Sequence, residues 1–133
     1  MDPTTHALML SDDLIFTSRV TGTGRDLGLA VQSARTEPAL RELFARIKPA
    51  CLILDLSNPG LEIANLMDWL QQTGEKRPCV VAYGSHVDTA TLKAARAAGC
   101  DEVLTRSQFV EDLPRKLAEW IRGHNESQPK DAR

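Results

Sequence analysis

The sequence predicts an α/β fold in which five parallel strands form one doubly wound sheet with helices on both faces. Two observations lead to this fold class. Short apolar runs alternate five times with longer amphipathic segments along the 133 residues, and no segment is repeated. The run at 51–54 is apolar throughout, as a central parallel strand covered on both faces should be.

The first half of the chain contains three expected strands, at 7–10, 29–32 and 51–54. Between the first two lies a helix whose apolar face consists of Phe16, Val20 and Leu27, and whose second half we expect to be loosened by Gly22, Gly24 and Gly28. The next helix begins at Glu37 and Pro38, because proline is tolerated at the first helical position, and Pro49 ends it.

The second half contains three helices and two strands. The third helix carries Ile63, Leu66, Met67 and Leu70 and ends near Gly74. A strand at 79–83 is followed by a loop in which Asp88 is suited to cap the helix 89–98, and Gly99 ends that helix. A strand at 102–105 precedes the last helix, whose apolar face is Phe109, Leu113, Leu117, Trp120 and Ile121.

Length and composition indicate one domain at 7–122, with an extension at 1–6 and a polar tail at 123–133 that we expect to be disordered. The net charge is −2, with 16 basic and 18 acidic residues, which argues against a nucleic-acid binder. The first residues predict no signal peptide, and no apolar run is long enough to predict a membrane span. Three cysteines without motif spacing favour a reducing cytoplasm.

Polar residues follow the expected strands where parallel strands would bring their carboxyl ends together. They are Ser11, Asp12 and Asp13 after the first strand, Asp55 after the third, Tyr83 to Ser85 after the fourth and Arg106 after the fifth. Carboxylates gathered at one edge repel one another unless a cation lies between them, and Mg²⁺ is the natural candidate. One carboxylate could then attack a phosphoryl group.

This order of residues resembles the receiver domain of two-component response regulators. Segments 52–59 and 97–104 are especially similar to that family, and the resemblance extends from about Ala7 to Ile121. It implies a flavodoxin-like (βα)5 receiver sandwich in which Asp55 is the phosphoacceptor and Arg106 the phosphate partner. The implied metal ligands are Asp12, Asp13, Asp55 and the backbone carbonyl of Ser57, with the choice between Asp12 and Asp13 left open.

The chain departs from the family at three positions. The family has Lys-Pro after the fifth strand, where Arg106 and Ser107 stand here. The hydroxyl residue of the switch, after the fourth strand, corresponds to Tyr83 when counted from Pro78 and to Gly84 when counted from Gly99, with Ser85 as the nearest small hydroxyl. Ser11 is a candidate for the place of the first acid.

Each of these residues also has a simple structural interpretation. Asp55 suits a turn, the acids at 12 and 13 suit a helix start, and Arg106 could be an ordinary exposed arginine. His86 fits a solvated loop, and His6, His86 and His124 lack the spacing of metal ligands. Trp69 and Trp120 fit helix packing.

The leading functional prediction is a non-enzymatic, single-domain receiver that accepts a phosphoryl group on Asp55 with Mg²⁺. Its partners would be a histidine kinase, a phosphotransfer protein or another signalling protein, and it could dimerise through the face of the fourth and fifth strands. The alternative is a pseudo-receiver that binds partners independently of phosphorylation. A flavodoxin-like small-ligand binder is a third possibility, although no phosphate loop follows the first strand.

Overall fold

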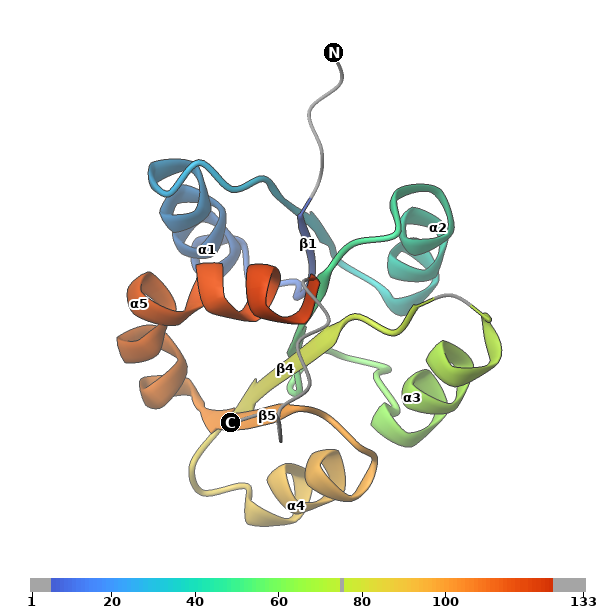
Figure 1. Ribbon diagram of the computed structural model, residues 1–133. Helices are drawn as coiled ribbons and strands as arrows, with labels where there is room; N and C mark the ends of the chain where they lie inside the picture. The colour runs from blue at the N-terminus through green and yellow to red at the C-terminus, as the bar shows by residue number, and fades with distance from the viewer. Residues whose placement is uncertain (1–5, 75, 126–133) are drawn as a thin grey trace, which may run out of the picture.

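The computed structural model describes residues 6–74 and 76–125, and these form one five-stranded parallel sheet with helices on both faces (Figure 1). The strand order is β2-β1-β3-β4-β5. The strands are β1 (Ala7–Leu10), β2 (Val31–Ala34), β3 (Cys51–Asp55), β4 (Cys79–Gly84) and β5 (Glu102–Thr105). The predicted fold class is confirmed, and β1 and β3 lie in the middle of the sheet as buried strands should.

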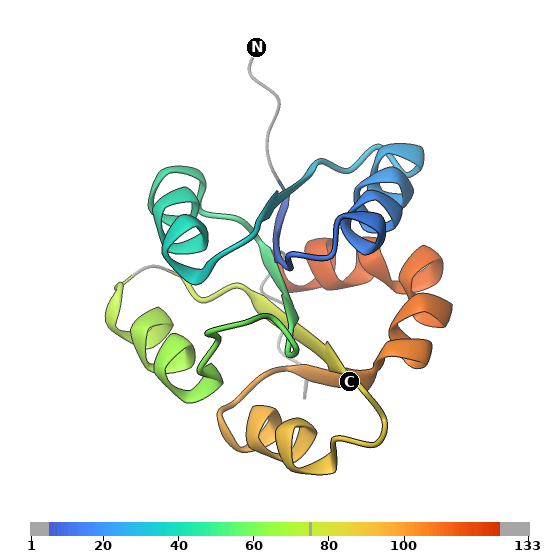
Figure 2. The same ribbon diagram turned by 180° about the vertical axis from the view of Figure 1, so that it is seen from behind.

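Five helices cover the two faces, as the opposite views of Figures 1 and 2 show. They are α1 (Leu14–Asp26), α2 (Glu37–Ile47), α3 (Ile63–Gln72), α4 (Thr89–Ala97) and α5 (Arg106–Asn125). Side chains of α1 and α5 pack on one face of the sheet, and side chains of α2, α3 and α4 pack on the other. Among the described residues, no helix is both long and apolar enough to cross a membrane.

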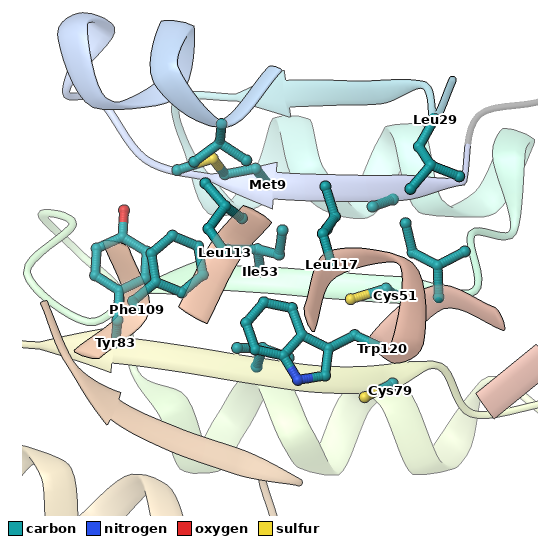
Figure 3. Close-up of a cluster of buried hydrophobic side chains, with 14 of the residues drawn as sticks. Met9, Leu29, Cys51, Ile53, Cys79, Tyr83, Phe109, Leu113, Leu117 and Trp120 are labelled. Carbon is teal, nitrogen blue, oxygen red and sulfur yellow. The ribbon is translucent and has the colours of Figure 1, made fainter. Parts of the chain in front are cut away.

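The cluster on the α1/α5 face is shown in Figure 3. Met9 and Ile53 of the central strands belong to one cluster with Leu113, Leu117 and Trp120 of α5. The same cluster contains Cys51 and Cys79, so two of the three cysteines are small apolar side chains in the core. Burying this cluster is a main source of the fold's stability, at roughly 25 cal/mol per Å² of apolar surface.

Helix ends follow the signals in the sequence. Three side chains accept hydrogen bonds from the first-turn amides of α1, α2 and α4, namely Asp13, Thr36 and Asp88. The prediction that Asp88 caps α4 is therefore confirmed. Gly99 follows α4 with φ of +100°, the left-handed conformation that glycine adopts most readily.

The second strand begins two residues later than predicted. The amide of Leu29 donates to the carbonyl of Gly24, and the amide of Ala30 donates to Nδ1 of His6, so these residues close α1 before β2 starts. The glycines do not interrupt α1, which is unbroken to Asp26. At Gly24 a Cβ atom would lie 2.8 Å from the Leu29 carbonyl oxygen, so the turn needs the bare backbone.

Helix α5 runs past Gly123, where the sequence predicts the polar tail to begin, and ends at Asn125. Residues 126–133 of that tail and residues 1–5 of the N-terminal extension lie outside the described residues. Pro114 lies inside the helix, and Figure 1 shows α5 changing direction along its length. A proline removes one backbone hydrogen bond and clashes with the preceding turn, which accounts for such a bend.

Candidate functional site

Asp55 is the last residue of β3 and lies at the carboxyl edge of the sheet, where the sequence places the candidate site. Its strand lies between β1 and β4, so residues that follow those strands surround it. Only 2% of Asp55 is exposed. The predicted phosphoacceptor is therefore a buried carboxylate, which needs hydrogen-bond donors to compensate for its lost hydration.

Both carboxylate oxygens of Asp55 have such donors. The hydroxyl of Ser11 donates to Oδ2 at 2.7 Å, and the backbone amide of Ser57 donates to Oδ1 at 2.9 Å. Ser11 is itself fully buried. The residue that directly contacts Asp55 after β1 is therefore the serine and not either of the acids that follow it.

The two acids after Ser11 have separate positions. Asp13 caps α1 by accepting from the amide of Phe16 at 3.0 Å, and its other oxygen lies 3.7 Å from Nη1 of Arg106. The amide of Asp13 donates to the Ser11 hydroxyl at 3.1 Å. Asp12 is exposed. The capping interpretation of the acid pair holds for Asp13, because helix starts favour an acid that accepts from the first turn.

Arg106 is the first residue of α5, and its guanidinium lies over two aromatic rings. The Cζ atom is 4.9 Å from the centroid of Phe16 and 5.7 Å from the centroid of Tyr83. A cation at the start of a helix is opposed by the helix dipole, so these rings and Asp13 compensate for an unfavourable placement. The arginine thereby links α5 to α1 above Tyr83.

A reciprocal pair of hydrogen bonds fixes the start of α5. The Thr105 hydroxyl accepts from the Gln108 amide at 3.1 Å, and the Gln108 side-chain oxygen accepts from the Thr105 amide at 3.0 Å. This is a capping box, which the spacing of threonine and glutamine three residues apart could have indicated from the sequence. It sets the position from which Arg106 reaches the edge of the sheet.

Tyr83 is fully buried and lies opposite Asp55 in the pairing of β4 with β3. Its ring stacks on Phe109 at 4.6 Å and lies 5.0 Å from Phe16. Its hydroxyl oxygen has no hydrogen-bond partner among the residues that the structure describes. Burial raises the pKa of Tyr83 well above the ordinary range of a phenol, and the nearby Asp55 carboxylate adds to the rise, while Ser11 and Arg106 oppose it.

The other two switch candidates do not present a hydroxyl to Asp55. Gly84 ends β4 and has no side chain, and a Cβ atom there would lie 3.4 Å from Cβ of Leu56. Ser85 is exposed, and its hydroxyl accepts from the amide of Val87 at 3.3 Å within its own loop. Of residues 83 to 85, the structure brings only Tyr83 into the site.

This donor set does not fit Mg²⁺. In 6–74 and 76–125, no group of three or more histidine, cysteine or acidic side chains is arranged to hold a metal ion. Asp55 is occupied by Ser11 and Ser57, and Asp13 by its helix and Arg106. Mg²⁺ favours several carboxylate oxygens in its octahedral shell, whereas here each oxygen of Asp55 already accepts a hydrogen bond, Asp13 is engaged by its helix and Arg106, and Asp12 is exposed.

The thiols and the loop histidine lie outside the site. Burial raises the pKa of the Cys100 thiol to about 11, and the hydrogen bond to Cys79 followed by burial raises that of Cys51, so both stay protonated at neutral pH. His86 is exposed on the loop after β4, as its solvated interpretation predicts.

Comparison with known proteins shows which fold the chain has, but it identifies no relative by sequence. No protein-family model matches the chain, and no curated protein matches it by sequence. Solved structures do match. The signal receiver domain of a response regulator from Bermanella marisrubri is 21% identical, with a TM-score of 0.77 over 90% of this chain and 100% of that chain.

Two further structures have the same fold. The chemotaxis response regulator CheY4 of Vibrio cholerae is 15% identical, with a TM-score of 0.75 over 90% of this chain and 100% of that one. A chain from the co-crystal structure of the Saccharomyces cerevisiae phosphotransfer protein Ypd1 and the receiver domain of Ssk1 is 17% identical, with a TM-score of 0.76 over 99% and 97%. The chain therefore has the fold of response-regulator receiver domains, as the sequence predicts.

Proposed function

We propose that this chain is a cytoplasmic, non-enzymatic signalling module that uses the receiver fold to bind a protein partner without a phosphoryl switch. The observation that carries the proposal is the state of Asp55, which is buried and accepts one hydrogen bond on each oxygen. A carboxylate that attacks phosphorus needs an oxygen free to approach in line with the leaving group. Here both oxygens already accept a hydrogen bond and only 2% of Asp55 is exposed, which restricts that approach.

The surroundings of Asp55 support the same proposal. The hydroxyl opposite it in β4 belongs to Tyr83, whose ring is packed in the core between Phe16 and Phe109. A side chain stacked in this way cannot rotate toward a phosphoryl group without opening the core. The charge partner of Arg106 is already Asp13, at 3.7 Å.

Exposed apolar residues at the same edge support partner binding. Large hydrophobic side chains that are exposed in the described part of the chain are Leu14, Ile15, Leu27 and Val87. Three of these lie just after β1 or β4: Leu14 is 58% exposed, Ile15 85% and Val87 75%. Apolar residues gathered at one edge favour a protein contact more than scattered ones do. The receiver-fold protein Ssk1 has been crystallised with a phosphotransfer protein, so a signalling protein is the partner class we propose.

The direct test is intact mass after incubation with acetyl phosphate and Mg²⁺, with Asp55→Asn as the matched control and a phosphorylatable receiver in parallel. We expect no added phosphoryl group on this chain while the parallel receiver gains one. A gain that Asp55→Asn abolishes would overturn the proposal.

The second candidate is the phosphoacceptor function itself. It is favoured by the position of Asp55 at the end of β3, on the edge where the receiver fold presents its acids. In that case a histidine kinase or phosphotransfer protein would supply the phosphoryl group, and Mg²⁺ would bind Asp55 alongside or in place of its present donors. Dimerisation through β4 and β5 is also proposed, since the NtrC4 receiver forms a dimer when activated by beryllofluoride. Sedimentation velocity with and without beryllofluoride tests it.

A further inference from the structure

We propose that Ser11 takes the place of a divalent cation at Asp55, and that this single position decides whether the sheet edge binds Mg²⁺. The inference rests on the proposed function and extends it from the state of Asp55 to the residue responsible. It predicts that one substitution gives the chain a cation site that it lacks.

The hydrogen bonds of Ser11 fix its hydroxyl in one orientation. Its one proton is donated to Oδ2 of Asp55 at 2.7 Å, a distance typical of a hydroxyl that donates to a charged carboxylate. Its oxygen accepts the amide of Asp13 at 3.1 Å. Because Ser11 is fully buried, water does not compete for either bond.

The charges of Asp55 and Asp13 are balanced by internal groups, whereas the exposed Asp12 faces solvent. Asp55 is stabilised by the Ser11 hydroxyl and the Ser57 amide, and Asp13 by the Arg106 guanidinium. Two carboxylates in direct contact would repel each other and draw in a proton or a cation. The chain avoids this repulsion because the side chain in contact with Asp55 is a neutral hydroxyl.

Ser11→Asp would reverse this arrangement. A second carboxylate would lie where a neutral hydroxyl now contacts Asp55, and Asp55 would lose the hydrogen bond from Ser11 that stabilises its charge. Two buried carboxylates with oxygen atoms this close are unstable as a pair of anions. Mg²⁺ or another hard divalent ion relieves the repulsion, since such ions bind carboxylate oxygens.

The experiment compares thermal unfolding of the full chain with and without Mg²⁺, together with calorimetric titration of Mg²⁺ into the folded proteins. The variants are wild type, Ser11→Ala, Ser11→Asp and the double change Ser11→Asp with Asp55→Asn. We expect wild type and Ser11→Ala to show no Mg²⁺-dependent shift. Ser11→Asp should unfold at a lower temperature without the ion and gain roughly 5 °C at about tenfold excess over its Kd. The double variant should lose that gain.

A purely structural role for Ser11 gives a different result. Both single variants would then be destabilised to an extent that Mg²⁺ does not change, and this outcome overturns the inference. Should Ser11→Asp be unfolded in buffer, refolding from urea with and without Mg²⁺ is the readout. Refolding in Mg²⁺ alone supports the inference, and no folding in either condition overturns it.

The inference and the proposed function fail separately. Mg²⁺ binding by wild type overturns the role of Ser11, whatever its phosphorylation state. A wild-type chain that gains no phosphoryl group, together with a Ser11→Asp variant that binds no Mg²⁺, overturns the inference and leaves the proposed function in place.

Discussion

Tyr83 faces Asp55 across the parallel pairing of β4 with β3, so a phenol and a carboxylate project from adjacent strands to the same side of the sheet. The ring of Tyr83 stacks on Phe109 of α5 (Figure 3), and its hydroxyl has no hydrogen-bond partner in the described part of the chain. Tyr83, one of the two positions that the resemblance assigns to the switch hydroxyl, is thus a large side chain that is part of the core. Stability and site chemistry are coupled at this residue.

The first prediction concerns the ionisation of Tyr83. Burial and the Asp55 charge raise its pKa, so the folded protein keeps the phenol protonated where an unfolded chain ionises, above about pH 10. The folded state then binds more protons, and stability falls as pH rises through this range. Because the sequence has a single tyrosine, the rise in absorbance at 295 nm that accompanies phenol ionisation comes from this group. We expect tyrosinate to appear together with loss of helical circular dichroism; ionisation while the fold is intact would contradict the prediction.

The second prediction is that Tyr83→Phe does not destabilise the protein. It removes a buried hydroxyl that has no partner within 6–74 and 76–125 and keeps the stacked ring, so the unfolding free energy should be unchanged or increase by about 1 kcal/mol. Urea denaturation at pH 7 measures it. A decrease in unfolding free energy of more than about 1 kcal/mol would show that the hydroxyl has a hydrogen-bond partner in solution.

The third prediction concerns the Ser11 hydroxyl. Ser11→Ala leaves Oδ2 of Asp55 without its donor, and the unfolding free energy should fall by roughly 1.5–3 kcal/mol, as for hydrogen bonds to charged groups. Ser85→Ala is the matched control, because that hydroxyl is exposed and contacts only its own loop. In a double-mutant cycle with Asp55→Asn, the two changes should be coupled, and additive effects would argue against the contact.

The fourth prediction separates the neighbouring acids. Asp13→Ala removes the cap of α1 and should cost about 1 kcal/mol, whereas the exposed Asp12 should be replaceable by alanine with a clearly smaller effect. Urea denaturation of both variants compares them directly. Equal effects would show that the cap is not what stabilises this helix start.

The fifth prediction concerns the exposed apolar residues at the carboxyl edge. Ile15→Ser should leave stability nearly unchanged, since 85% of the side chain is exposed, and should weaken binding to the partner at least tenfold. Leu27→Ser is the control on the same helix, because Leu27 is exposed at the opposite end of α1. Surface plasmon resonance with the isolated partner measures both, and an equal loss would argue against this edge as the contact.

The fold was predictable because its signals are local. The apolar run 51–54 and the acid that follows it are adjacent in sequence, and they appear as β3 and its last residue. The start of β2 was not predictable, since it depends on Leu29 and Ala30 bonding to Gly24 and to His6, a residue 24 positions away from Ala30. The spacing of residues along the sequence does not predict a hydrogen bond between positions this far apart.

The site was predicted in position but not in detail. Asp55, Tyr83 and Arg106 gather at the expected edge because parallel strands end together. Whether Ser11 or Asp12 would contact Asp55 depends on the direction of one side chain after β1, which the sequence does not determine. The stacking of Arg106 on Phe16 likewise depends on where α5 begins, and the capping box of Thr105 and Gln108 sets that point.

Gly84 limits which side chains the end of β4 can hold. A Cβ atom at this position would lie 3.4 Å from Leu56 and 3.5 Å from Leu92, which is ordinary van der Waals contact, so alanine fits there. A branched side chain such as threonine extends beyond that contact and would press on one of these leucines. The residue next to Tyr83 therefore has room for a single added carbon atom and not for a larger polar group.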